Sequence, residues 1–168
     1  MLDLNRVHFK FGLLLKELDK RGVELSYIGI TDVVLAKYGK HFEYIAMSQT
    51  RLVPEVYYFL FSDKYYMKQL LLQNGFPVPK GRAFKKTEME SARAYIAEQL
   101  GFPVVVKPTD GSHGDNVHAN LSTIEEFNGA YAEIIKKPEV TNVLVEKHHP
   151  GDDYRFYIIK DRGLAVVR

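Results

Sequence analysis

The chain has 168 residues, of which 46% are hydrophobic and 26% charged. This balance is ordinary for a globular protein, and the length suffices for one core or two small lobes. The formal net charge of +2 is too small to indicate a nucleic-acid or membrane surface as partner. The absence of cysteine excludes disulfides, thiolate metal sites and a catalytic thiol.

The first sixty residues carry weaker patterns than the rest. Apolar residues at helical spacing predict a helix over Asn5–Lys20, and Gly22 follows as its stop. Residues 23–30 and 42–47 each predict a strand. Two stretches in this part give no secure assignment, namely residues 32–41 and 50–61.

From Ser62 the patterns predict helices and strands with clear boundaries. Ser62 is expected to cap a helix that ends at Gly75. Thr87–Glu90 fits a capping box for a second helix, which Gly101 stops. The expected strands of this part are residues 78–84, 103–106 and 117–121, and a polar loop covers residues 108–116.

The last part is expected to hold one helix and three strands. Ser122–Glu125 fits another capping box, and the apolar residues of the helix that follows share one face. The chain ends inside an apolar strand, and natural domains usually avoid such an unfinished sheet edge, so we expect it to continue in a longer protein. The expected face is Ile124, Phe127, Tyr131, Ile134 and Ile135, and the expected strands are residues 142–146, 153–160 and 164–168, the last two joined by a turn at 161–163.

Lys107 is the most informative single residue. It follows three valines, so a buried strand would deliver its ammonium group to the mouth of a loop. A lysine held in this way is costly unless an anion or a carboxylate meets it. Gly111 and Gly114 in the loop would let backbone N–H groups converge on a phosphate. The same pattern also fits a lysine that reaches water beside a plain hairpin loop, and spacing alone does not separate the two.

A second candidate region begins at Glu146, which closes an apolar strand. The extended segment after it offers backbone groups that suit the edge of a nucleotide base. In the next strand, period-2 alternation places Asp153 and Arg155 on one face. The arginine fork suits phosphate or carboxylate, although an ion pair within the sheet is the alternative reading. Lys64, in the first turn of a helix, is by itself most simply a solvated lysine.

Several other sites are excluded or disfavoured. The phosphate-binding P-loop and the dinucleotide fingerprint are both missing. Residues 111–114 formally match the Gly-x-x-Gly loop of RNA-binding KH modules, but that loop joins two helices and would not follow a valine strand. We therefore expect no nucleic-acid partner. Zinc is also disfavoured, because the spacing of four histidines matches no helical ligand pair: His113, His118, His148 and His149.

Taken together and in order, four separated motifs resemble the ATP-grasp superfamily. The order and spacing are most like the ATP-grasp parts of cyanophycin synthetases and bifunctional glutathione synthetases, with D-alanine–D-alanine ligases as more distant relatives. The resemblance covers about residues 50–168. The motifs are residues 62–64 with 69–71 and 75–79, residues 101–108, residues 110–114, and residues 143–146 with 151–155.

This resemblance implies an α/β (α+β) fold in three parts. Residues 1–61 would form a small α/β element that precedes the grasp fold. Residues 62–147 would form the linker helix and the N-terminal lobe of the ATP-grasp domain. Residues 148–168 would form the hinge and the first strands of a truncated C-terminal lobe. ATP would lie between the two lobes.

The resemblance also implies roles for individual residues toward ATP. Lys64 matches a lysine directed at the phosphates, and Lys107 matches one that bridges the adenine side and the α-phosphate. Glu146 matches the position that faces the adenine amino group, and Asp153 the acidic residue that takes the ribose hydroxyls. The other matches are Gly111, Ser112, His113 and Gly114 in the loop over the β- and γ-phosphates, Lys147, His148 and His149 in the hinge that reads the base, and Arg155 and Arg168 as catalytic residues that face the transferred phosphate and the acyl-phosphate.

The family reaction forms an acyl-phosphate from a carboxylate and ATP, which an amine then attacks. Catalysis of this kind is mostly positioning and charge neutralisation, to which Mg²⁺ contributes. The magnesium ligands of the family would lie beyond residue 168, so we expect no metal ligand in this chain and little activity from the chain alone.

The leading function is an ATP-dependent carboxylate–amine ligase that acts on an amino acid or a peptide. A non-catalytic module that binds or senses ATP is the first alternative, and an ATP-grasp enzyme that uses another acid is the second. No apolar run approaches the roughly 20 residues that cross a bilayer, and the N-terminus lacks a secretory pattern. We therefore expect a cytoplasmic protein without a membrane partner, and leave open whether it forms a homo-oligomer.

Overall fold

The structure is a computed structural model that describes residues 3–47, 49–111, 114–158 and 164–168. It divides into two compact units, Met1–Phe59 and Leu60–Arg168. Helices and antiparallel sheets occur together in it, which confirms the expected α/β (α+β) class. The proposed three-part division at residues 61 and 147 remains a prediction.

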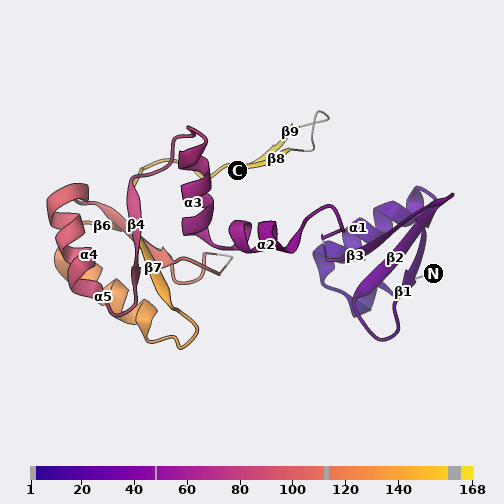
Figure 1. Cartoon of the computed structure of the whole chain (residues 1–168), viewed down its shortest axis with the longest axis horizontal. Helices are drawn as coiled ribbons and strands as arrows, with labels where there is room; N and C mark the ends of the chain where they lie inside the picture. Colours follow the sequence, from indigo (N-terminus) through magenta and orange to yellow (C-terminus); the bar gives the residue numbers. More distant parts are fainter. Residues whose placement is uncertain (1–2, 48, 112–113, 159–163) are drawn as a thin grey trace. The chain divides into compact units, whose positions relative to one another are not determined.

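The first unit packs one helix against a three-stranded antiparallel sheet (Figure 1). A short 3₁₀ helix, Leu4–Arg6, precedes α1, Phe9–Lys20, and Gly22 ends this region with a positive φ of 77°. The strands are β1, Glu24–Tyr27, β2, Val33–Tyr38, and β3, His41–Ala46. The core consists of Phe11, Leu15, Val34, Ala36 and Ile45.

Two helices fill the region between residues 55 and 73. The first, α2, spans Glu55–Ser62 and occupies a stretch that had no secure assignment. The second, α3, spans Lys64–Gln73. The expected cap at Ser62 is wrong, because Ser62 still belongs to α2. Asp63 caps α3 instead, and its carboxylate accepts hydrogen bonds from the backbone N–H groups of the first turn.

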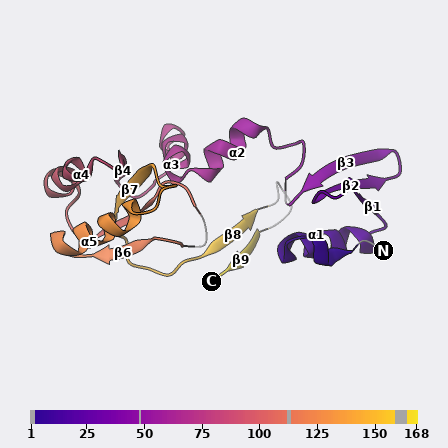
Figure 2. The same ribbon diagram turned by 90° about the horizontal axis from the view of Figure 1, so that it is seen from below.

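The second unit is built around a four-stranded antiparallel sheet of order β4-β7-β5-β6. Two helices cover one face of it, and α3 lies on the other side (Figures 1 and 2). The helices of the covered face are α4, Met89–Tyr95, continued by a π-helical turn over Ile96–Leu100, and α5, Ile124–Ile135. The strands are β4, Gly81–Lys85, β5, Val104–Pro108, β6, His118–Leu121, and β7, Asn142–Lys147.

Successive side chains of the two central strands, β5 and β7, point alternately into the core and toward the candidate site. Val104 and Val106 of β5, like Val143 and Val145 of β7, are fully buried against the two covering helices. The intervening residues therefore point toward the opposite face. The expected face of α5 is confirmed: Phe127, Tyr131 and Ile134 are buried, and Ile124 and Ile135 pack at the rim.

Both expected capping boxes need correction. The residue before α4 is Glu88, whose carboxylate accepts a hydrogen bond from the backbone N–H of Lys85 rather than capping the helix. The box at α5 is real but one residue later than expected, since it joins Thr123 and Glu126. The two adjacent hydroxyl residues and the two adjacent glutamates, all in one short segment, allowed either register from the sequence.

The chain continues into a hairpin of β8, Arg155–Ile158, and β9, Leu164–Val167. β8 begins two residues later than expected. Asp153 therefore precedes the strand and does not share one of its faces with Arg155 as predicted. The expected turn at 161–163 lies outside the described residues. In the described part of the chain, no helix is long and apolar enough to cross a membrane.

Candidate functional site

Lys107 meets a carboxylate on the face of the sheet that points away from the covering helices. In the β5–β7 register Val105 lies opposite Glu146, and Lys107 lies opposite Leu144. Lys107 and Glu146 are therefore diagonal neighbours on one face. The Nζ atom of Lys107 lies 2.5 Å from Oε2 of Glu146. The expectation that an anionic group must meet this lysine is confirmed, and the partner is the other residue that ends an apolar strand.

A second lysine, which sequence reasoning missed, completes this cluster. Lys68 of α3 donates a hydrogen bond to Oε1 of Glu146. The side chains of Lys68 and Glu146 are 5% and 9% exposed, whereas that of Lys107 is 22% exposed. One carboxylate thus lies between two ammonium groups in a nearly dry environment. The available sequence signal was the i, i+4 spacing of Lys68 from Lys64, which places both on one side of the helix.

Glu146 stays ionised in this cluster. Burial by itself would raise the pKa of its carboxyl group, but the hydrogen bonds from Lys107 and Lys68 outweigh that effect, and the pKa lies below its ordinary value. The three side chains together carry one net positive charge. A net cation on a sheet face is a suitable neighbour for an anionic ligand.

Lys64 joins the start of α3 to the loop after β5. Its backbone N–H donates to the carbonyl of Thr109 at 2.7 Å. Its ammonium donates to the carbonyls of Asp110 and Gly111 at 2.8 and 2.9 Å. Burial, and then repulsion from Lys107, lower the pKa of Lys64. An anion placed near both lysines would relieve that repulsion, so their arrangement favours binding of a polyanion.

The loop after β5 has the glycine conformations that a phosphate loop needs. Gly111 and Gly114 both adopt positive φ, 86° and 79°, a region that other residues rarely enter. Ser112 and His113, the other two expected loop residues, lie outside the described residues. The glycines thus fit the expectation that backbone N–H groups can turn toward a ligand there.

Gly81 in β4 makes room for Glu146. The two residues pair directly across β4 and β7. A Cβ atom at Gly81 would lie 2.6 Å from the carbonyl oxygen of Val145 and 2.7 Å from Cγ of Glu146. Because backbone atoms of β7 cannot move aside cheaply, β4 can pair at this position only with glycine. Sequence reasoning had not singled out Gly81.

The first residues of the expected hinge are anchored inside the unit. The backbone N–H groups of Lys147 and His148 donate to the carbonyls of Lys80 and Pro103. The ammonium of Lys147 donates to the carbonyls of Phe102, at 2.6 Å, and Gly101, at 3.3 Å. These two backbone donors are therefore engaged, and a base would have to compete for them. His149 follows as an exposed residue.

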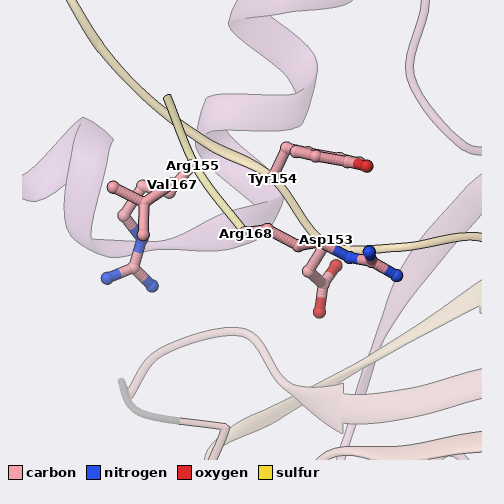
Figure 3. Close-up of a pocket in the computed structure, with 5 residues that line it drawn as sticks. All are labelled: Asp153, Tyr154, Arg155, Val167 and Arg168. Carbon is pink, nitrogen blue, oxygen red and sulfur yellow. The ribbon is translucent and has the colours of Figure 1, made fainter. Parts of the chain in front are cut away.

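The three remaining expected residues gather in the hairpin. Asp153, Arg155 and Arg168 line a pocket of about 480 Å³ together with Tyr154 and Val167 (Figure 3). Pairing of Arg155 with Val167 brings the end of β9 beside the start of β8. The guanidinium groups of Arg155 and Arg168 point away from each other (Figure 3). That of Arg168 also forms an ion pair of 2.8 Å with Asp152.

The described residues do not fit a magnesium site. Within them, no group of three or more His, Cys, Asp or Glu side chains is placed to hold a metal ion. Two acidic groups of the candidate regions are engaged in ion pairs, Glu146 with two lysines and Asp152 with Arg168. No chemical step at this site is therefore assigned to a metal held by these residues.

A family model, the RimK-like ATP-grasp domain, matches residues 61–146. This segment is 86 of the 168 residues, just over half of the chain. The chain belongs to the RimK-like ATP-grasp family. The expected membership of the ATP-grasp superfamily is thus confirmed, and the matched segment contains α3, Lys107 and Glu146.

Relatives and solved structures agree with this membership. The chain is 27% identical to a cyanophycin synthetase of Trichormus variabilis over 92% of the chain and 17% of the relative. It is 34% identical to the glutathione biosynthesis bifunctional protein GshAB of Streptococcus thermophilus over 63% of the chain and 14% of the relative. The bifunctional glutathione synthetase of Pasteurella multocida superposes with a TM-score of 0.58 at 26% identity, over 97% of this chain and 22% of that structure. The chain spans about a fifth or less of the length of these relatives.

Proposed function

We propose that this chain is the ATP-binding part of an ATP-dependent carboxylate–amine ligase that acts on an amino acid or a peptide. The observation that carries the proposal is the convergence of Lys64, Lys107 and Glu146 beside the loop that contains Gly111 and Gly114. Family membership supports the nucleotide, and the names of the relatives support amide-bond ligation as the reaction class.

In this proposal Lys107 and Lys64 contact the phosphates of ATP, and Glu146 faces the adenine amino group. The segment from Lys147 to His149 lies along the base, and Asp153 accepts hydrogen bonds from the ribose hydroxyls. The phosphate contacts of Lys107 and Lys64 are supported by the net positive charge of the buried cluster and by the lowered pKa of Lys64 next to Lys107. Both features destabilise the ligand-free protein and favour the protein with an anion bound.

The proposed reaction has two balanced steps. A carboxylate oxygen of the acid substrate attacks the γ-phosphorus, and the bond from that phosphorus to the bridging oxygen breaks, which yields an acyl-phosphate and ADP. A neutral amine then attacks the acyl carbon, inorganic phosphate leaves with its electron pair, and the nitrogen loses a proton. Arg155 and Arg168 would face the transferred phosphate and the acyl-phosphate, where a guanidinium offers paired N–H donors.

The convergence of Lys64, Lys107 and Glu146 by itself calls only for a bound anionic ligand, so one second candidate is a module that binds ATP without ligating anything. The two candidates differ in a product that can be trapped. Hydroxylamine converts an acyl-phosphate into a stable hydroxamate.

To test this, the full-length protein is incubated with Mg-ATP and hydroxylamine. Amino acids or dipeptides are supplied one at a time as the acid substrate. The ligase proposal expects ADP and an equal amount of hydroxamate with at least one acid, and loss of both products in Arg155→Ala. ATP binding with no hydroxamate from any acid would favour the second candidate. No ATP binding would contradict both.

A further inference from the structure

We propose that Lys68 is a positioning residue of the phosphate site, which holds Glu146 so that Lys107 can leave the carboxylate for a nucleotide phosphate. Lys68 itself does not contact the nucleotide. This inference rests on the proposed function, because it concerns how the ATP-binding lysine becomes available.

The two carboxylate oxygens of Glu146 pair with two different lysines, and these lysines differ in their exposure to solvent. Oε1 of Glu146 accepts from Lys68 of α3, and Oε2 accepts from Lys107 of β5. Lys68 is 5% exposed, whereas Lys107 is 22% exposed. An anion from solvent can therefore reach Lys107, whereas Lys68 is buried between α3 and the sheet.

Charge explains why the second lysine matters. If Glu146 were paired with Lys107 alone, a move of Lys107 toward a phosphate would leave a buried carboxylate without a counter-charge, which is a costly state. With Lys68 in place, the carboxylate keeps one partner when Lys107 departs. The same lysine also raises the net charge of the cluster from zero to +1, which favours an incoming anion.

Neighbouring charges favour the same movement. Lys64 is repelled by Lys107 and has Asp110, Asp63 and Glu146 as its attractive neighbours. A phosphate bound between Lys64 and Lys107 would remove that repulsion. The resting cluster is thus set up so that one lysine stays with the carboxylate and the other binds the ligand.

The test compares Lys68→Met and Lys68→Arg with a matched control, Lys137→Met, which removes the same charge from an exposed position of the second unit. Each chain is titrated with Mg-ATP, inorganic tripolyphosphate and adenosine. We expect Lys68→Met to weaken ATP and tripolyphosphate binding roughly tenfold, the scale of coupling within one charged network. Adenosine carries no phosphate but keeps the adenine that Glu146 is proposed to face, so its affinity should fall much less than that of tripolyphosphate. Lys68→Arg should restore most of the loss.

A second readout does not depend on any ligand. Carbon-13 NMR of the Glu146 carboxyl group gives its pKa directly, and Lys68→Met should raise that pKa because it removes one of the two hydrogen-bonding ammonium groups. Lys68→Gln, which keeps a donor but no charge, replaces Lys68→Met if the methionine variant does not fold.

The outcomes separate this inference from the proposed function. Failure of the unchanged protein to bind ATP would overturn both. ATP binding by the unchanged protein with equal affinity in Lys68→Met would overturn the role of Lys68 alone. Equal losses for adenosine and tripolyphosphate would also overturn it, since they would show that Lys68 only maintains the fold. A selective loss for the phosphate ligands, with rescue by arginine, is the result that the inference expects.

Discussion

Glu146→Gln should destabilise the second unit strongly, because it leaves buried ammonium groups without a counter-charge. Lys68 is 5% exposed and loses its ionised partner, and Lys107 loses the same carboxylate. Removing one partner of a buried ion pair typically costs about 3–5 kcal/mol. This is a large share of the roughly 5–15 kcal/mol that stabilises an ordinary domain. Glutamine still offers one carbonyl acceptor, so we expect a loss of stability of about 3 kcal/mol, at the lower end of the cost of breaking a buried pair.

Hydrogen exchange of the β7 amides is the suitable assay, because it reports the unit that contains Glu146 rather than the whole chain. The double variant Glu146→Gln/Lys68→Met is the informative control. Replacing both members of a buried pair is often neutral or stabilising relative to leaving one behind. The double variant should therefore be more stable than Glu146→Gln alone.

Two results would refute this reasoning. A loss below about 1 kcal/mol in Glu146→Gln would show that the cluster is solvated like a surface ion pair. A double variant less stable than the single one would show that Lys68 contributes through packing and not through its charge.

A pH series of the unfolding free energy adds a further check. The pKa of Glu146 lies below its ordinary 4.5, so its contribution is complete above pH 4.5 and disappears as the pH falls through the lower folded value. Glu146→Gln should lack that acid-side loss.

Three further predictions concern other parts of the second unit. Lys107→Ala should weaken ATP binding in a calorimetric titration more than it changes hydrogen exchange, because Glu146 keeps its other lysine; unchanged ATP affinity would remove Lys107 from the site. Asp153→Asn should lower affinity for ATP but not for tripolyphosphate, and equal losses for both ligands would argue against a ribose contact. Tyr131→Phe should cost about 1 kcal/mol in urea unfolding at pH 7, since it removes a 2.9 Å hydrogen bond to the carbonyl of Lys85. Burial raises the pKa of Tyr131 to about 12 from 10.0, so its contribution is complete below pH 10.0 and is lost as the pH rises toward 12; a steep alkaline loss that persists in Tyr131→Phe would contradict this assignment.

Periodicity predicted most of the second unit because its elements are strongly amphipathic. The apolar runs at 104–106 and 143–145 each have alternate residues in a core under helices, so hydrophobicity alone identifies them. The caps were less predictable. At α5, Ser122 and Thr123 both suit a cap, and Glu125 and Glu126 both suit its partner, so only the three-dimensional structure selects the register.

The site was predicted residue by residue but not as a network. Lys107 and Glu146 each ended an apolar strand, yet their pairing depends on which strands are neighbours and in what register. Lys68 was not predicted, because lysines on a helix are usually exposed to solvent, whereas Lys68 is buried. Its i, i+4 spacing from Lys64 is a local signal, but the carboxylate that pairs with it lies 78 positions later, where no local pattern can indicate it.

An NMR titration with Mg-ATP, with Mg-GTP as the control, tests the central claim most directly, because it detects binding even in the millimolar range. We predict shifts that cluster at Lys107, at Gly111 and Gly114, and from Glu146 to His149, with ATP bound more tightly than GTP. Shifts of equal size with both nucleotides, or shifts confined to other surfaces, would contradict an adenine-nucleotide site at the end of β5 and β7.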